Sequence, residues 1–128
     1  MKISHEKPPN WDVLVARFGA TWGKTVVTYG DTCHCARPLS NDLAVHEAVH
    51  VGQQLSYGVE AWWQRYMVDP DFRVHQETEA YRAQFLYINR TIKDRNLRFK
   101  ERDRLARDLS SNLYGKSIGY LEAYKKIG

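Results

Sequence analysis

The chain has 128 residues, enough for one domain with a modest hydrophobic core, and 43% of them are hydrophobic, which is ordinary for a soluble protein. No apolar run approaches the roughly 20 residues that a membrane-spanning helix needs, which argues against an integral membrane protein. Residues 1–6 lack the apolar stretch of a signal peptide, so we expect a cytoplasmic or virion-associated protein with no membrane partner.

Much of the net charge of +4 comes from arginines and lysines in residues 90–107. Acidic side chains, among them Asp94, Glu101 and Asp103, are interleaved with these bases. Such alternation is typical of a solvated helix with local ion pairs and not of a surface that binds nucleic acid. We expect no nucleic-acid partner, whereas this Arg-rich helix could contact a protein partner.

The first third of the chain predicts an arm, a helix and a short β element. Residues 1–10 include two adjacent prolines and predict an N-terminal arm. Residues 11–18 are amphipathic and predict a first helix. Residues 21–29 alternate and are rich in β-branched side chains, which predicts one strand, or a hairpin with turns at Gly23 and Gly30.

Cys33 and Cys35 are too close in sequence for an easy mutual disulfide, and a reducing compartment would keep them as thiols. We interpret them as loop or strand-end cysteines. Two alternatives stay open. They could form part of a structural metal site, although no second ligand pair stands out, or one thiolate could fill the open position of a nearby metal ion.

The most informative feature is a His-Glu-x-x-His pattern made by His46, Glu47 and His50. A proline and several possible N-cap residues precede it and Gly58 follows, which predicts a helix over residues 41–57. Residues four apart lie on one helix face, so both imidazoles can reach one metal ion. The glutamate, offset by one position, can lean over the water that such an ion binds.

The same helix carries enough apolar side chains to pack into a core: Leu43, Val45, Ala48, Val49, Val51 and Leu55. Burying two histidines and a glutamate is costly unless those groups are satisfied, and a metal ion satisfies them. The competing interpretation is a solvated helix face that happens to carry the three residues.

A zinc site with two histidines needs a third protein ligand. Gln53 and Ser56 stand where the extended three-histidine motif would place a glycine and a histidine, so that solution is excluded. The other common solution is a glutamate on a later helix. Asp69 and Pro70 predict the start of such a helix, which should run to about Asn89.

Two glutamates on this later helix, Glu77 and Glu79, are candidates, and they point in different directions because they are two residues apart. We favour Glu77, which shares a face with Val74 and Ile88 beside the small Ala80. Glu79 groups with an arginine and should face solvent. His75 is a weaker candidate ligand.

At these residues the chain resembles the glutamate-zincin (gluzincin) metallopeptidases, especially their minimal members, the minigluzincins, and small metallopeptidase-like proteins of bacteria and phages. The resemblance covers roughly residues 22–89. It implies that His46, His50 and Glu77 bind zinc and that Glu47 is the general base. Many relatives have an acidic residue four positions after the ligand glutamate. Tyr81 stands there in this chain, so the partner of a zinc-bound histidine is not identified.

The remaining elements should be helical. Residues 59–68 predict a short helix with a core-facing aromatic cluster, the last third should be helical to about Asn112, and residues 120–126 predict a short terminal helix or tail. We therefore expect an α+β, mainly helical protein. Residues 11–128 would form a single compact, minimal zincin-like domain with an active-site helix, a glutamate helix, a small strand or hairpin and a C-terminal helical extension.

The expected function is that of a zinc metalloendopeptidase that hydrolyses peptide bonds in a peptide or protein substrate. A zinc-activated water would attack the amide, with Glu47 as general base. Tyr57, Tyr66, Tyr81 and His75 are open candidates for a donor to the oxyanion. The alternative is a catalytically weak or inactive structural or adaptor protein that keeps zinc for stability and could be part of a phage particle.

Overall fold

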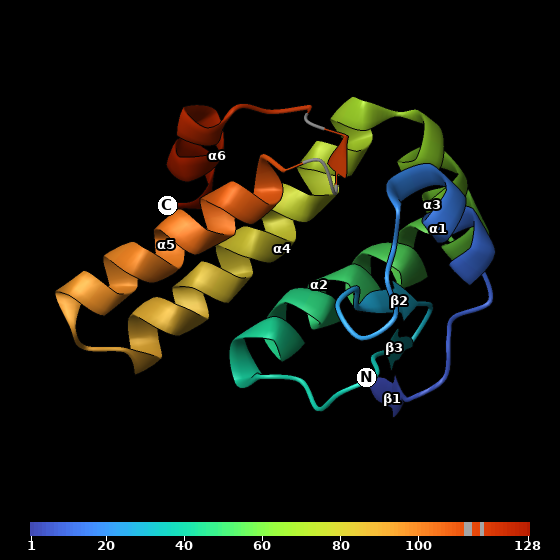
Figure 1. The fold of residues 1–128 in the computed structure, drawn as a ribbon, viewed down its shortest axis with the longest axis horizontal. Coiled ribbons are helices and arrows are strands. Elements are labelled where there is room, and N and C mark those ends of the chain that lie inside the picture. The colour runs from blue at the N-terminus through green and yellow to red at the C-terminus, as the bar shows by residue number, and fades with distance from the viewer. Residues whose placement is uncertain (112–113, 116) are drawn as a thin grey trace.

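The computed structural model describes residues 1–111, 114–115 and 117–128. It is mainly helical with one small sheet, which confirms the expected fold class (Figure 1). The strands are β1 (Lys2–Ser4), β2 (Val27–Tyr29) and β3 (Thr32–His34). The helices are α1 (Trp11–Phe18), α2 (Asn41–Tyr57), α3 (Val59–Val68), α4 (Pro70–Thr91), α5 (Arg95–Leu109) and α6 (Tyr120–Ile127).

The sheet has the order β1-β3-β2, and β2 and β3 form an antiparallel hairpin. Gly30 has a φ of 64°, which a glycine adopts without steric cost, so the predicted turn at this residue is confirmed. The expected strand over residues 21–29 is too long. The carbonyl of Thr21 accepts hydrogen bonds from the N–H groups of Lys24 and Thr25, so this stretch forms a local turn.

The N-terminal segment is not a free arm throughout. Lys2–Ser4 pairs in parallel with β3, and the N–H of Cys35 donates to the carbonyl of Ser4 at 3.0 Å. Two prolines at 8 and 9 predict a break in regular structure, but they do not show that the preceding residues find a strand partner. With β1 on one side of β3, β2 is the other edge of the sheet.

Helix α2 lies between the sheet and α4, and it packs against α3 as well (Figure 1). Its bounds agree with the prediction. Helix α4 begins as expected, since the side chain of Asp69 accepts from the N–H of Phe72 and Pro70 is the first helical residue, but it continues two residues beyond Asn89. The other face of α4 carries α5 and α6.

The expectation that apolar side chains bury α2 holds only in part. Leu55 is 62% exposed and Ala48 is also exposed, whereas the other four apolar residues are half-buried: Leu43, Val45, Val49 and Val51. The buried residues of this helix are His46, Glu47, His50 and Gln54. Because positions 46, 50 and 54 are four apart, they form one polar stripe that faces α4 and β2. The polar stripe, and not an apolar one, is the buried face of the helix.

The last third of the chain contains two helices with a break before them. Helix α4 ends at Thr91, and α5 starts after Asp94, whose side chain accepts from the N–H groups of Asn96 and Leu97. The expected helix end near Asn112 lies outside the described residues. Within the described residues, no helix is both long enough and apolar enough to cross a membrane.

The largest hydrophobic cluster joins α4, α5, α6 and the segment between the last two. Its buried members are Tyr81, Phe85, Ile88, Leu105, Ala106, Leu109, Tyr114, Ile118, Ala123 and Ile127. Two smaller clusters fix α1 and α3: Trp11, Leu14, Ala20 and Val27 form one, and Trp62, Tyr66 and Phe72 form the other. Together, the three clusters pack around α4 and surround the polar stripe of α2.

Leu105 is fully buried in the largest cluster, so Leu105→Ala should lower the free energy of unfolding by about 2–5 kcal/mol. Urea unfolding followed by circular dichroism measures this loss. Leu121 is 72% exposed, and Leu121→Ala should change stability by less than about 0.5 kcal/mol. Equal losses in the two variants would contradict the described packing of the C-terminal helices.

Candidate metal centre

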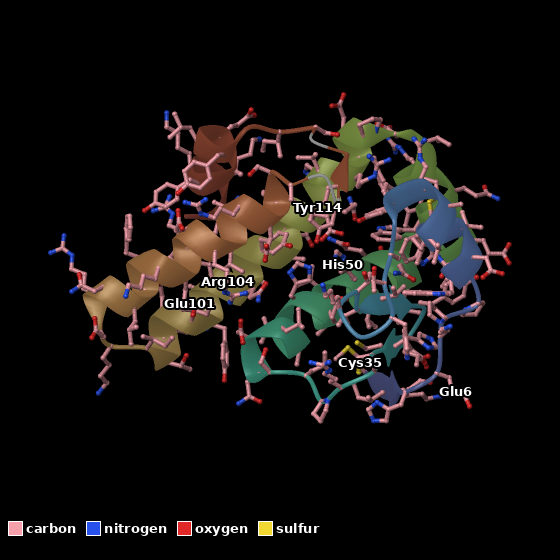
Figure 2. All side chains as sticks on the ribbon, in the orientation of Figure 1. Glu6, Cys35, His50, Glu101, Arg104 and Tyr114 are labelled. Carbon is pink, nitrogen blue, oxygen red and sulfur yellow. The ribbon has the colours of Figure 1, made fainter. Side chains whose placement is uncertain are left out.

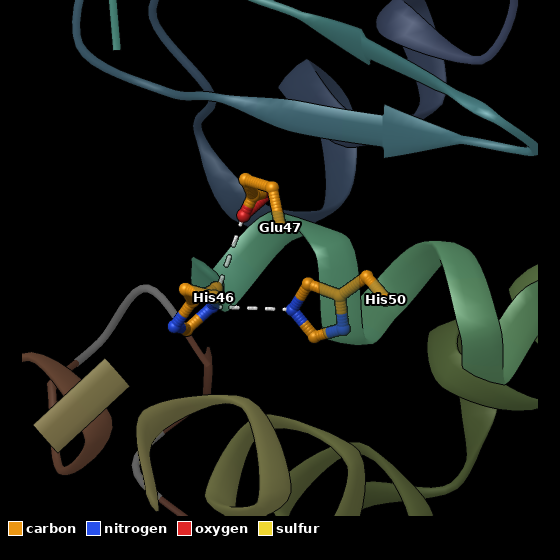
Figure 3. Close-up of side chains that lie close together, drawn as sticks. All are labelled: His46, Glu47 and His50. Atoms are coloured by element: carbon orange, nitrogen blue, oxygen red, sulfur yellow. Dashed lines mark hydrogen bonds and ion pairs between the residues drawn. The ribbon is translucent and has the colours of Figure 1, made fainter. Parts of the chain in front are cut away.

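Side chains from α2 and α4 converge between these two helices. The Nε2 atoms of His46 and His50 lie 3.2 Å apart, and Oε1 of Glu77 lies 3.2 Å from each of them. All three residues are at most 5% exposed. Figure 3 shows the two imidazoles facing one another on α2 with Glu47 beside them. The structure therefore brings together the three residues that the sequence predicts as ligands.

The spacing of these atoms fits a tetrahedral metal ion. Bonds of about 2.0–2.1 Å place two ligand atoms of such an ion about 3.3–3.4 Å apart. The buried group formed by His46, Glu47 and His50 could bind a metal ion. Of the two nearby glutamates, Glu77 is better placed as a ligand, because Oε2 of Glu47 lies 3.8 Å from the His46 nitrogen.

A glutamine side chain orients each histidine by contacting Nδ1, the ring nitrogen that faces away from the centre. Nδ1 of His46 lies 2.9 Å from Oε1 of Gln84, and Nδ1 of His50 lies 2.9 Å from Oε1 of Gln53. A carboxamide oxygen can only accept, so each Nδ1 carries the proton and donates it. When the ring is neutral, each Nε2 then has a lone pair directed at the shared centre, which is the state that binds metal.

Tyr66 restrains the carboxylate of Glu77. Its hydroxyl donates to Oε2 of Glu77 at 2.7 Å, in a buried position. One carboxylate oxygen is thereby held away from the centre, and the other faces both imidazoles. This arrangement favours a single bond from Glu77 to a metal ion.

Three acceptor atoms at this spacing repel one another unless a cation lies among them. Burial disfavours a charge on His50, yet the carboxylates of Glu77 and Glu47 outweigh this effect and raise the pKa of His50 to about 9. Burial acts to raise the pKa of Glu77, but His50 and His46 lower it below its ordinary value. The centre thus attracts positive charge, whether a proton or a metal ion.

Glu47 occupies a different position from the three converging side chains. It is 4% exposed, and burial raises the pKa of its carboxyl group above the ordinary value. The hydroxyl of Thr28 on β2 donates to its Oε1 at 3.3 Å. Gln54 keeps this strand in place, because its amide donates to the carbonyl of Thr28 and accepts from the N–H of Gly30.

Two cavities meet at the centre, and His46, Glu47 and Tyr114 line both. The smaller has a volume of about 80 Å³ and is also lined by apolar side chains of α1, α3, β2 and the segment before β2: Leu14, Phe18, Ala20, Val27, Trp62 and Trp63. The larger, of about 450 Å³, lies toward α5 and also contacts Lys24, Arg104 and Asp108. Figure 2 shows where Tyr114, His50 and Arg104 lie relative to one another.

The other candidate residues do not join the centre. Glu79 and His75 are exposed, as expected for Glu79. Cys33 and Cys35 are buried free thiols, and among the described residues neither belongs to the group that could hold a metal ion. This placement gives no support to a thiolate that fills an open metal position. Burial also raises the pKa of the Cys33 thiol above its ordinary value.

The candidate oxyanion donors differ in their surroundings. Tyr57 is 46% exposed and accepts from Arg65, and the hydroxyl of Tyr66 is engaged by Glu77. The hydroxyl of Tyr81 lies 2.8 Å from that of Tyr114, and one of these two must donate to the other. The second hydroxyl of this pair keeps a free O–H. Tyr57 and His75 line neither cavity at the centre, and Tyr66 donates its proton to Glu77. Tyr81, with Tyr114, is therefore the predicted donor that lines a cavity and belongs to a pair with a proton to spare.

The sequence interpretation gave Gln53, Gln84 and Tyr114 no role at the centre. Gln84 follows Glu77 by seven residues, or two helical turns, so the helical period places it beside the face of Glu77 but does not indicate that it contacts His46. Gln53 follows His50 by three residues and is placed beside it in the same way. Tyr114 comes from a distant segment, and no local pattern indicates that it reaches the centre.

Comparisons with known protein families, with curated proteins and with solved structures found no match to this chain.

We expect Glu77→Ala to weaken zinc binding by more than about 100-fold, since it would remove one of the three expected ligands and not only a group that orients a ligand. Glu79→Ala is the matched control, because Glu79 lies on the same helix but is exposed. Competition with a chelating dye measures both affinities. Zinc should also raise the melting temperature of the parent protein. Equal affinities in the two variants would refute the choice of ligand.

Proposed function

We propose that the protein is a zinc-dependent metallopeptidase that hydrolyses peptide bonds with Glu47 as general base. The observation that supports this proposal is the convergence of His46, His50 and Glu77 at 3.2 Å with a further buried carboxylate next to them. Three protein ligands leave a tetrahedral ion with one open position, which is the pattern of catalytic and not structural zinc sites.

The donor set argues for zinc among the common metals. Two imidazole nitrogens and one carboxylate oxygen suit zinc, whereas magnesium and calcium prefer oxygen ligands. When bound, zinc would act as a Lewis acid that polarises a carbonyl group and lowers the pKa of water.

Glu47 is suited to take up a proton. Its raised pKa makes the carboxylate a stronger base than an exposed glutamate, and Thr28 binds only its Oε1. The free Oε2 lies on the side of His46 and can accept a proton from an attacking water. Glu47 then passes this proton to the leaving amine, which restores its carboxylate for the next cycle.

We expect Glu47→Gln to abolish peptide hydrolysis while zinc binding is retained. The substitution keeps the size and the hydrogen bond to Thr28 but removes the base, so the rate should fall by at least about 100-fold. Cleavage of a quenched fluorescent peptide library, together with zinc content by mass spectrometry, measures both properties. Undiminished cleavage would exclude Glu47 as the base. If neither protein cleaves any peptide while both bind zinc, the adaptor alternative is favoured.

The smaller cavity sets an expectation for the substrate. Its volume is about 80 Å³, which is smaller than the apolar cavity of about 150 Å³ that is known to hold benzene. A valine or leucine side chain beside the scissile bond should therefore be accepted, and a phenylalanine or tryptophan should be disfavoured by about tenfold in kcat/KM.

Phe18→Ala should enlarge this cavity and shift the preference toward aromatic side chains, because Phe18 forms part of its wall. Leu43 lines only the larger cavity of the two, so Leu43→Ala is the matched control and should leave the preference unchanged. Peptides that differ at a single position provide the measurement. An unchanged preference in Phe18→Ala would show that the cavity does not receive a substrate side chain.

A further inference from the structure

A continuous chain of hydrogen bonds leads from His46 to the surface. Behind His46, the amide nitrogen of Gln84 donates to Oδ2 of Asp42 at 2.9 Å. The guanidinium of Arg104 on α5 donates to the same Oδ2 at 3.3 Å. Arg104 in turn binds Glu101, and the two are neighbours on α5 in Figure 2. Three helices thus meet in one line of polar contacts that ends on a candidate metal ligand.

The far end of this chain decides how Gln84 is oriented. A carboxamide can present either its oxygen or its nitrogen to His46, because the two groups have nearly the same shape. An ionised carboxylate can only accept hydrogen bonds, so Asp42 requires the nitrogen of Gln84 on its side. The oxygen must then face Nδ1 of His46.

The charge of Asp42 is maintained by its surroundings. Burial acts against the charge, but hydrogen bonds from Gln84 and Ser40 and the nearby Arg104 lower the pKa of Asp42. Its side chain is 21% exposed, whereas Gln84 is 2% exposed. A buried amide between a carboxylate and an imidazole is polarised by the carboxylate, which strengthens the bond at its other end.

His50 provides an internal comparison. Gln53 orients this histidine with the same amide geometry, but its nitrogen donates to the backbone carbonyl of Gln76 at 3.0 Å. No side-chain carboxylate takes part in that contact. The two histidines therefore differ in what stands behind the glutamine, and a change at Asp42 should affect only one of them.

We propose that Asp42 is a positioning residue for the metal centre: held by Arg104, it acts through Gln84 to keep the proton of His46 on Nδ1 and its Nε2 lone pair directed at the metal ion. This inference rests on the proposed zinc site and not on peptidase activity. It assigns a structural role in metal binding to a contact between α5 and the first turn of α2.

The test is Asp42→Ala in the full chain. Zinc affinity should fall by about tenfold, which is the lower end of the losses seen when a residue that hydrogen-bonds to a metal ligand is changed. In nitrogen-15 spectra of the zinc-loaded protein, the Nδ1–H signal of His46 should weaken or move, while that of His50 stays unchanged. Asp103→Ala is the matched control, because Asp103 pairs with an arginine on α5 and its side chain is 29% exposed. This variant should keep parental affinity.

Asp42→Asn is a second variant that retains the size of the side chain. The new amide can either accept a hydrogen bond from Gln84 or donate one to it, so the orientation of Gln84 is no longer fixed but the contact remains. The zinc affinity should therefore lie between those of the parent and Asp42→Ala. Parental affinity and an unchanged His46 signal in both variants would overturn the proposal. Equal changes in the His46 and His50 signals would also overturn it, because they would indicate general loosening. Neither readout depends on the outcome at Glu47.

Discussion

Two imidazole nitrogens and one carboxylate oxygen meet at 3.2 Å between α2 and α4, and this unfavourable convergence of acceptors is the constraint that organises the molecule. Such a group is stable only with a cation, and it stays in place only if each member is held from behind. Gln53, Gln84 and Tyr66 supply that restraint. Zinc would supply the charge under the proposed function.

The centre also explains why α2 has the opposite amphipathicity to an ordinary surface helix. Its inward face carries polar groups, so the apolar contacts that stabilise this region come from neighbouring aromatic rings. The ring of Tyr81 lies 4.4 Å from that of His46, and Trp62 lies 5.7 Å from His50, both in edge-to-face geometry. The rings exclude water from the imidazoles without competing for their nitrogens.

Local sequence signals predicted the helices that carry the candidate ligands, and periodicity along α4 correctly placed Glu77 on the buried face and Glu79 on the exposed one. Gly58 marks the end of α2 and the start of α3, and α3 ends where Asp69 and Pro70 begin α4. Parallel pairing of β1 with β3 joins residues about 30 apart, and the position of Tyr114 depends on how α5 docks. Neither of these long-range contacts produces a periodic pattern in the sequence. The apolar side chains of α2 are less buried than their hydrophobicity suggests, because a buried polar centre occupies the inward face of this helix.

Gln54 has a consequence for how the protein behaves beside other chains. Its side-chain amide accepts from Gly30 and donates to Thr28, so it takes the place that a peptide group of an added strand would occupy along β2. Exposed sheet edges invite edge-to-edge association and aggregation. A single buried glutamine on a helix therefore closes part of the open margin of this small sheet and leaves fewer backbone groups there with which another chain could pair.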